Sequence, residues 1–360
     1  MRRKLAILLG TVLLFSFLTG CGSVHQKKAA DVWSFTDSCG REVELPSEID
    51  RIVPSGPLAQ MVLYTLCPDK LQSLATPLTR TQKKYINKKY WDLPVTGQFY
   101  GGGSTVSYET IIATAPDVII DIGETKDGIA DDMDSIQKST GIPTVFVQAE
   151  LTTMADAYET LGKITGEEKQ AGDCAAYIRE TLAEAEKYSA RVPRSQRKRV
   201  LFSQGEYGTE VLGAGSIHSE VLDLVGAINV AQLNHLSSNG NSEVSMEQIL
   251  TWNPEVVILS PDSNYDEIFS DPLWASVQAV KTGAVYEVPG APYNWMDRPP
   301  SVQRILAVKW LGNLLYPEAF PYDMIEETQE FYSLFYHDDL TQAEARALLA
   351  HSTEKLGENG

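Results

Sequence analysis

The sequence is poor in positive charge and in long apolar segments. Its 360 residues include 30 Lys and Arg against 48 Asp and Glu, which gives a formal net charge of −18. A chain this acidic repels nucleic acid over most of its surface, so we expect no nucleic-acid partner. A single apolar stretch, near the N-terminus, approaches the length of about 20 residues that a membrane-spanning helix needs. The composition therefore excludes a polytopic membrane protein.

Motifs for catalysis and for metal binding are also missing. The chain contains no G-x-S-x-G and no H-E-x-x-H, the patterns of hydrolase nucleophile elbows and zinc peptidases. Its five scattered histidines do not supply the cluster of ligands that a free Zn or Mn ion needs. We expect no enzyme, no catalytic residue and no cofactor or metal site. An exported hydrolase is the alternative from another class, because Ser216, His218 and Asp223 lie close in the sequence.

Cysteine is scarce, with four residues in the whole chain and no C-x-x-C pair or zinc spacing. After Cys21, an odd set of three remains, namely Cys39, Cys67 and Cys174. Outside the cell such a set allows at most one internal disulfide and leaves one thiol over. A Cys39–Cys67 disulfide and three free thiols are both compatible with the sequence.

The N-terminus is typical of an export signal. Residues 2–4 are basic, residues 5–18 are almost wholly apolar, and Leu18-Thr19-Gly20-Cys21 follows at once. This ending resembles a bacterial lipoprotein signal, which implies cleavage before Cys21 and acylation of its thiol. A single transmembrane anchor is the alternative, but the run is short for a spanning helix.

Cleavage of residues 1–20 would remove three basic residues and no acidic residue, which changes the net charge from −18 to −21. Residues 21–32 are then mostly small and polar and predict a flexible tether. The mature protein would be extracytoplasmic and attached by lipid to the bacterial cell membrane.

Short β-branched runs alternate with helical stretches in the rest of the chain. This alternation predicts an α/β fold with mainly parallel sheets. The expected strands are at 51–55, 117–122, 144–147, 199–203, 255–259 and 284–288, and an early hairpin is expected at 33–36 and 41–45. The runs at 117–122 and 144–147 are continuously apolar, as is typical of buried parallel strands.

A long amphipathic stretch, about 152–188, separates the two groups of strands, and Thr165-Gly166 interrupts it. Its second piece, from Glu167 to about Ala190, would be about 36 Å long. We therefore expect two lobes joined by one long rigid helix. The predicted division is an N-terminal lobe at 33–150, a connecting helix at 151–190, a C-terminal lobe at 191–320, and C-terminal helices at 321–360 that pack on the C-terminal lobe.

An internal repeat gives both lobes the same plan. Residues 106–120 and 244–258 are identical at seven of fifteen positions and lie 138 residues apart. Each copy predicts an N-capped helix, a turn with proline and an acidic residue, and a buried strand. Ser245-x-x-Gln248 and Thr341-x-x-Glu344 also match the capping box. Two lobes of one plan leave a cleft between them, where a ligand would bind.

Several of these features together resemble a known family. They are the lipoprotein signal, residues 35–46 leading into 51–54, the repeated Ser-x-Glu-x-Ile motif, and residues 294–301 followed by 309–317. The set resembles substrate-binding lipoproteins of ABC importers, in the helix-linked class that handles ferric siderophores, haem and cobalamin. The likeness covers residues 33–320. It implies a monomer with two lobes, little hinge motion, a ligand between the lobes and an ABC importer permease as partner.

The resemblance implies a docking role for one surface glutamate in each lobe. The matching positions are Glu109 and Glu247, which would form salt bridges with arginines of the permease. A second explanation is local, because an acidic residue in the first turn of a helix interacts favourably with the helix dipole. Both explanations can hold together.

Candidate ligand contacts in the first lobe lie in loops that follow strands, because ligands of such folds sit where strands end. Ser55 follows the first strand, Arg80 is a candidate anion contact or a solvated surface residue, and Phe99 and Tyr100 could stack on a flat ligand. The glycines at 101–103 permit close backbone approach, but such a loop is also compatible with a simple turn.

In the second lobe, Tyr207 follows a strand, and His218 and His235 are the histidines in plausible cleft positions. A lone histidine is, however, often an ordinary hydrogen-bonded residue. The loop with Tyr293, Trp295 and Arg298 is the strongest candidate, because Trp295 would offer an apolar plate and Arg298 five donors for an oxygen-rich ligand. The alternative is that Asp297 and Arg298 only brace the loop.

The sequence thus predicts an extracytoplasmic binding lipoprotein that captures an iron chelate, as a ferric siderophore, and delivers it to the permease. Haem, cobalamin and an oxyanion such as molybdate or tungstate are the alternatives within the same architecture.

Overall fold

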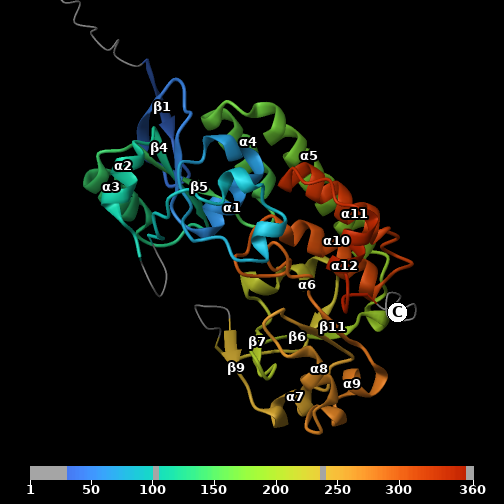
Figure 1. Ribbon diagram of the computed structural model, residues 1–360. Helices are drawn as coiled ribbons and strands as arrows, with labels where there is room; N and C mark the ends of the chain where they lie inside the picture. The colour runs from blue at the N-terminus through green and yellow to red at the C-terminus, as the bar shows by residue number, and fades with distance from the viewer. Residues whose placement is uncertain (1–30, 100–104, 236–240, 354–360) are drawn as a thin grey trace, which may run out of the picture.

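The computed structural model describes residues 31–99, 105–235 and 241–353. The predicted signal peptide, Cys21, most of the tether and Tyr100 lie outside these ranges, so their roles stay predictions. The described residues form two lobes, each with its own sheet, one above the other in Figure 1. This confirms the predicted α/β class.

The first lobe has a parallel sheet in the order β3 (Ile52–Pro54), β4 (Val118–Gly123) and β5 (Thr144–Gln148). Its strands are buried almost throughout, as continuous β-branched runs predict. The helices of this lobe are α1 (Pro57–Leu66), α2 (Tyr108–Thr114) and α3 (Ile129–Thr140). The predicted hairpin is also present, with β1 (Val32–Thr36) antiparallel to β2 (Glu42–Pro46).

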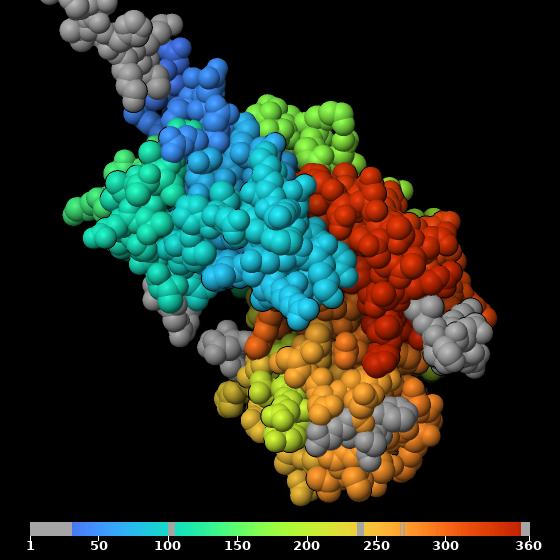
Figure 2. All heavy atoms as spheres, viewed as in Figure 1, coloured from blue at the N-terminus to red at the C-terminus, as the bar shows by residue number. Residues whose placement is uncertain are grey.

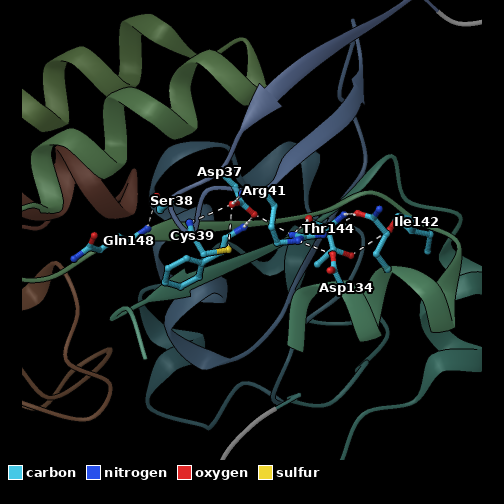
Figure 3. Close-up of polar contacts among 10 residues, drawn as sticks. Asp37, Ser38, Cys39, Arg41, Asp134, Ile142, Thr144 and Gln148 are labelled. Carbon is cyan, nitrogen blue, oxygen red and sulfur yellow. Dashed lines mark hydrogen bonds and ion pairs between the residues drawn. The ribbon is translucent and has the colours of Figure 1, made fainter. Parts of the chain in front are cut away.

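The turn of this hairpin is fixed to the edge of the sheet by Asp37 and Arg41 (Figure 3). The buried Asp37 carboxylate accepts hydrogen bonds from the backbone N–H groups of Cys39 and Arg41, at 3.1 and 2.9 Å. Arg41 Nη1 donates to Asp37 and to the Thr144 carbonyl, and Arg41 Nε pairs with Asp134 of α3 at 2.8 Å. The hairpin is therefore attached to both β5 and α3.

The second lobe has a six-stranded sheet whose centre is parallel. β11 (Val285–Glu287), β10 (Val256–Leu259) and β6 (Arg199–Gln204) run parallel, and β8 (Ile228–Asn229) pairs in parallel with β6. The antiparallel edge consists of β7 (Glu210–Leu212) and β9 (Asn241–Glu243). The helices of this lobe are α6 (Glu220–Leu224), α7 (Met246–Trp252), α8 (Tyr265–Ser270), α9 (Gln278–Thr282) and α10 (Gln303–Leu315).

Two helices form the connection between the lobes. α4 (Met154–Thr165) ends at Gly166, whose φ of 72° is the left-handed conformation that glycine adopts without strain. α5 (Glu168–Ser189) follows and is about 33 Å long. It packs on α4 in the first lobe and on α6 and α10 in the second (Figure 1). The predicted long helix and its interruption are both confirmed.

The C-terminal helices contact both lobes, which corrects the prediction that they pack on the C-terminal lobe. α11 (Met324–Phe331) packs on α10 and on α12 (Gln342–Leu348), but the π-helical segment Tyr332–Tyr336 between them packs on α1 and α5. Tyr336 lies beside Tyr64 of α1 and Phe335 beside Tyr158 of α4. In Figure 2 the red C-terminal segment accordingly touches both the cyan and the orange parts of the surface.

The internal repeat forms the same structure twice. Ser107 and Ser245 each cap a helix by accepting a hydrogen bond at 3.3 Å, from the N–H groups of Thr110 and Gln248. The second bond of the predicted capping box at Ser245 does not form, and the Gln248 side chain is exposed. At Thr341 both bonds of the capping box are present.

The three described cysteines are free thiols. Cys67 and Cys174 are buried and Cys39 is half-buried. The possible Cys39–Cys67 disulfide is therefore not formed.

Candidate ligand-binding site

The ends of the parallel strands in the two lobes face each other. Glu124 follows β4 in the first lobe, and the charges of His218, Arg304 and Glu220 from the second lobe act on its pKa. Burial and the nearby Glu150 carboxylate raise that pKa, and His218 and Arg304 oppose the rise. Figure 2 shows the surface indented between the blue-green first lobe and the yellow-orange second lobe. In α/β folds, ligands bind at this edge of the sheets.

A buried hydrogen-bond network at this edge is centred on Asp297. Its carboxylate accepts from Gln204 Nε2 at 3.1 Å and lies 2.5 Å from His218 Nδ1. Burial alone would raise the pKa of Asp297, but the bond and charge of His218 and the donors of Gln204 and Arg298 lower it below its usual value of 3.8. The network joins the end of β6 to the loop before α10.

Arg304, in the first turn of α10, is the second buried charge of the site. Its Nη1 donates to Glu220 Oε2 and to the Ile217 carbonyl, both at 2.9 Å. Burial lowers the pKa of Arg304, and the Glu220 carboxylate opposes that shift. The Nε atom of Arg304 is buried and has no hydrogen-bond partner among the described residues.

The first lobe contributes buried Asp121 and Ser55 at the ends of β4 and β3. The Ser55 hydroxyl donates to the Asp121 carboxylate. Burial raises the pKa of Asp121, and the Ser55 bond and the charge of Lys126 partly offset the rise. Gln148, the last residue of β5, donates a hydrogen bond from Nε2 to Glu150 Oε1 at 2.7 Å. Each lobe therefore places acidic and hydrogen-bonding groups at the same edge.

Several buried polar atoms near this edge have no partner within the described part of the chain. They are Ser203 Oγ, Gln204 Oε1, Ser263 Oγ, Ser301 Oγ and Arg304 Nε. Buried polar groups in native proteins are nearly always hydrogen-bonded, to protein, water or ligand. These atoms belong to the end of β6, the segment after β10 and the start of α10, where water or a polar ligand would supply the missing partners.

The predicted ligand contacts of the first lobe lie in different environments. Ser55 is buried and engaged with Asp121. Arg80 is exposed and lines a surface hollow with Lys83 and Trp91. Phe99 is half-buried and meets the ring of Tyr108 edge to face at 6.1 Å.

In the second lobe, His218 belongs to the Asp297 network, whereas His235 is exposed and Tyr207 is 64% exposed. Tyr293 is buried, and burial raises its pKa to about 12. Trp295 is fully buried, so the prediction that its ring forms a plate against the ligand is wrong. The reason is that Trp295 packs into the main hydrophobic core, where burial of a large apolar ring is most favourable.

The Arg298 side chain is partly exposed to solvent and is also held by an ion pair. Its side chain is 50% exposed, and its Nε lies 3.5 Å from the buried Asp297 carboxylate. Its φ of 49° is an uncommon conformation for a residue other than glycine. The bracing role considered for this pair is therefore present, and the guanidinium still reaches solvent.

Sequence reasoning missed Glu124 and Arg304 as site members and considered Asp297 only as a brace of the loop. It also missed Asp121, which is buried beside Ser55 in the first lobe. Asp121 carried a signal, because it interrupts an apolar strand where a carboxylate is costly to bury. Nothing in the sequence marked Arg304 as a site residue, since it lies in the first turn of a helix with no distinctive motif.

Glu109 and Glu247 are exposed in the first turns of α2 and α7. Hydrogen bonds from its own backbone N–H and from Ser245 lower the pKa of Glu247. Both carboxylates are thus available to a partner.

Within residues 31–99, 105–235 and 241–353, no helix has the length and apolarity needed to cross a bilayer. In the same ranges, no group of three or more His, Cys, Asp or Glu side chains is arranged to hold a metal ion.

Comparison with known proteins agrees with this architecture. Residues 75–292 match the family described as periplasmic binding protein. The molybdate-binding protein MolA of Haemophilus influenzae is 24% identical, over 84% of this chain and 90% of its own length. The Fe(3+)-citrate-binding protein YfmC of Bacillus subtilis is 24% identical, over 79% and 89%.

Among solved structures, an ABC transporter solute-binding protein from Sulfurospirillum deleyianum is 31% identical and covers 88% of this chain and 99% of its own, with a TM-score of 0.80. The chain therefore belongs to the periplasmic binding protein family, in the helix-linked class of ABC-importer substrate-binding proteins.

Proposed function

We propose that this protein is a lipid-anchored extracytoplasmic binding protein that captures a ferric chelate and delivers it to an ABC importer permease. The anchor would be the acylated Cys21. The observation that carries the proposal is the convergence of the Asp297 network, Arg304 and Glu124 at the facing edges of the two lobes.

The polar character of this edge favours an oxygen-rich chelate over a tetrapyrrole. Haem or cobalamin would need broad apolar or aromatic walls, and two of the predicted aromatic contacts, Tyr293 and Trp295, are buried in the core. Arg298 instead presents a guanidinium, whose forked donors match the carboxylate or hydroxamate oxygens of an iron chelator. The relative YfmC, which is named for binding Fe(3+)-citrate, supports a chelate of this kind.

An oxyanion such as molybdate is the second candidate. The relative MolA, which is named for molybdate, aligns with most of this chain. The exposed guanidinium of Arg298 is a donor that a small tetrahedral anion could also use.

A hydrolase is not supported by the arrangement of the three residues that suggested it. The Ser216 hydroxyl accepts from the backbone N–H of His218 at 3.3 Å and does not bond to its ring. The ring Nδ1 pairs with Asp297, not with Asp223. A nucleophile needs a base within hydrogen-bond reach, and this set does not provide one.

Calorimetric titration of the purified protein tests the ligand class. The panel contains ferric citrate, a ferric hydroxamate, haem, cobalamin and molybdate. We expect saturable binding of a ferric chelate and an affinity loss of about tenfold or more in Arg298→Ala, because one guanidinium–carboxylate contact contributes roughly 1.5–3 kcal/mol.

Arg346→Ala, which removes an exposed arginine in α12, is the matched control and should bind normally. Binding of molybdate alone would establish the second candidate, and turnover of an ester or phosphate substrate would favour an enzyme.

For delivery, we propose that Glu109 and Glu247 dock on arginines of the permease. The double variant Glu109→Ala, Glu247→Ala should abolish uptake while ligand affinity stays at the wild-type value. A normal uptake rate in this variant would refute the docking role.

A further inference from the structure

Another hollow lies in the second lobe where the parallel strands begin, away from the strand ends that form the candidate ligand site. It has a volume of about 670 Å³. Its walls come from the segment after α5, the start of β6, the residue before β10 and the end of α10. The lining residues include Arg191, Arg197, Lys198, Glu255, Leu315 and Tyr316. Because β6 and β10 begin here and end at the ligand edge, this hollow is separate from the candidate ligand site.

The hollow gathers positive charge on a strongly acidic protein. Residues 191–199 contain five Lys and Arg and no acidic residue, in a chain with a net charge of −18. Among the described residues, Arg191, Arg197 and Lys198 form no ion pair with a carboxylate. Arg197 Nε is buried and lacks a hydrogen-bond partner within the same ranges. None of these three cations is therefore engaged in an ion pair among the described residues.

The lining holds three basic and two acidic side chains, so a net positive charge of one remains. Glu255 already accepts a hydrogen bond from the backbone N–H of Arg199 at 2.9 Å, and Glu318 points to solvent at the rim. The Tyr316 hydroxyl is also engaged, since it accepts from the Lys198 N–H at 2.8 Å. The unused donors in the hollow are thus mainly the cationic groups of Arg197 and Lys198.

The remaining wall is apolar, which narrows the class of ligand. Val192, Leu315, Pro317 and Ala319 face the same space. One water molecule occupies only about 30 Å³. A hollow of about 670 Å³ therefore has room for much more than one inorganic anion. We propose that this hollow binds an organic phosphate ester, with its phosphate on Arg197 and Lys198 and its organic part against the apolar wall. A free phosphorylated metabolite and the headgroup of an anionic phospholipid share this chemistry.

Titration of the purified protein with glycerol 3-phosphate tests the proposal. Inorganic phosphate and glycerol are the reference ligands, and we expect the ester to bind several-fold more tightly than phosphate and glycerol not to bind. Arg197→Gln should weaken ester binding at least tenfold. Arg194→Gln is the matched control, because Arg194 belongs to the same basic segment but does not line the hollow. Lys198→Gln replaces Arg197→Gln if the latter fails to fold.

Vesicles distinguish the two sources. Stronger retention of wild type than of Arg197→Gln on phosphatidylglycerol vesicles, reversed by glycerol 3-phosphate and absent on phosphatidylcholine, identifies a lipid headgroup. Ester binding with equal vesicle retention of both proteins identifies a free metabolite. The proposal is overturned if no phosphate ester binds saturably, or if Arg197→Gln and Arg194→Gln lose affinity equally. Neither result bears on the iron chelate, since that site lies at the other end of the strands.

Discussion

Two residues at equivalent positions of the internal repeat share an uncommon backbone conformation. Ala115 and Asn253 follow α2 and α7 with φ of 45° and 42°. Asparagine tolerates this left-handed region, whereas alanine pays roughly 1–2 kcal/mol for it. The first copy of the repeat therefore carries strain that the second copy avoids.

Ala115→Gly should raise the free energy of unfolding by about 1 kcal/mol, because glycine adopts positive φ at little cost. Urea denaturation measures the change. The control is Ala113→Gly, the same substitution inside α2, which should lower stability by about 0.5–1 kcal/mol. Equal effects of the two substitutions would contradict the assignment of strain to Ala115.

Asp297 should make the stability of the protein depend on pH. Its pKa is lowered in the folded state, so its stabilising contribution is fully present above the unfolded value and is lost as pH falls through the folded value. We expect Asp297→Asn to lose about 3 kcal/mol or more at pH 7, since it leaves His218 and Arg298 without their carboxylate. The gap between variant and wild type should narrow as pH falls below 3.8. Denaturation curves between pH 3 and 7 measure it, and a gap that does not change with pH would contradict this role.

At the scale of elements, the hairpin is connected to the first lobe by its turn and by Val43 and Leu45 of β2, which are buried in the main hydrophobic core. Any pull on the predicted lipid tether reaches the lobe through β1, β2 and the contacts of Asp37 and Arg41 with β5 and α3 (Figure 3). The turn thus helps to connect the predicted anchor to the lobe.

Asp37→Ala should destabilise the protein by about 3 kcal/mol, because it leaves the backbone N–H groups of Cys39, Arg41 and Phe146 without their acceptor and removes one partner of the Arg41 guanidinium. Hydrogen exchange should rise first in β5 and the hairpin. Glu42→Ala, an exposed change in β2, should have little effect. Unchanged exchange in β5 for Asp37→Ala would show that the turn does not hold the sheet edge.

Local sequence patterns predicted most of these elements. Continuous β-branched runs gave β4, β5, β6 and β10, and Gly166 marked the helix break, because strand burial and helix termination depend on nearby residues. Contacts between distant segments were not predictable in this way. The His218–Asp297 pair joins residues 79 positions apart, and the burial of Trp295 depends on a core assembled from both lobes.

At the scale of the whole molecule, the two lobes share one hydrophobic core. That core includes Val118 of the first sheet, Phe202 of the second and the aromatic residues of the π-helical segment. The C-terminal segment therefore joins the lobes, and we expect this shared core to limit hinge motion between them.

Phe335→Ala should lower stability by about 3–5 kcal/mol, because the ring is fully buried between Tyr158, Tyr177 and Phe331. We also expect the variant to show a wider range of lobe separations by small-angle scattering. Leu334→Ala, a half-buried neighbour, is the control and should cost less. A variant with wild-type stability would show that this segment does not join the lobes.

The central claim is that an iron chelate binds where the strand ends of the two lobes face each other. The most direct test uses crystals grown with ferric citrate or a ferric hydroxamate. Diffraction data collected at the X-ray absorption edge of iron give an anomalous difference map that locates the metal. The account predicts an iron peak between Glu124 and the His218–Asp297 pair, with chelator oxygens on Arg298. Iron on an outer face of either lobe, or no ordered iron at saturating chelate, would contradict it.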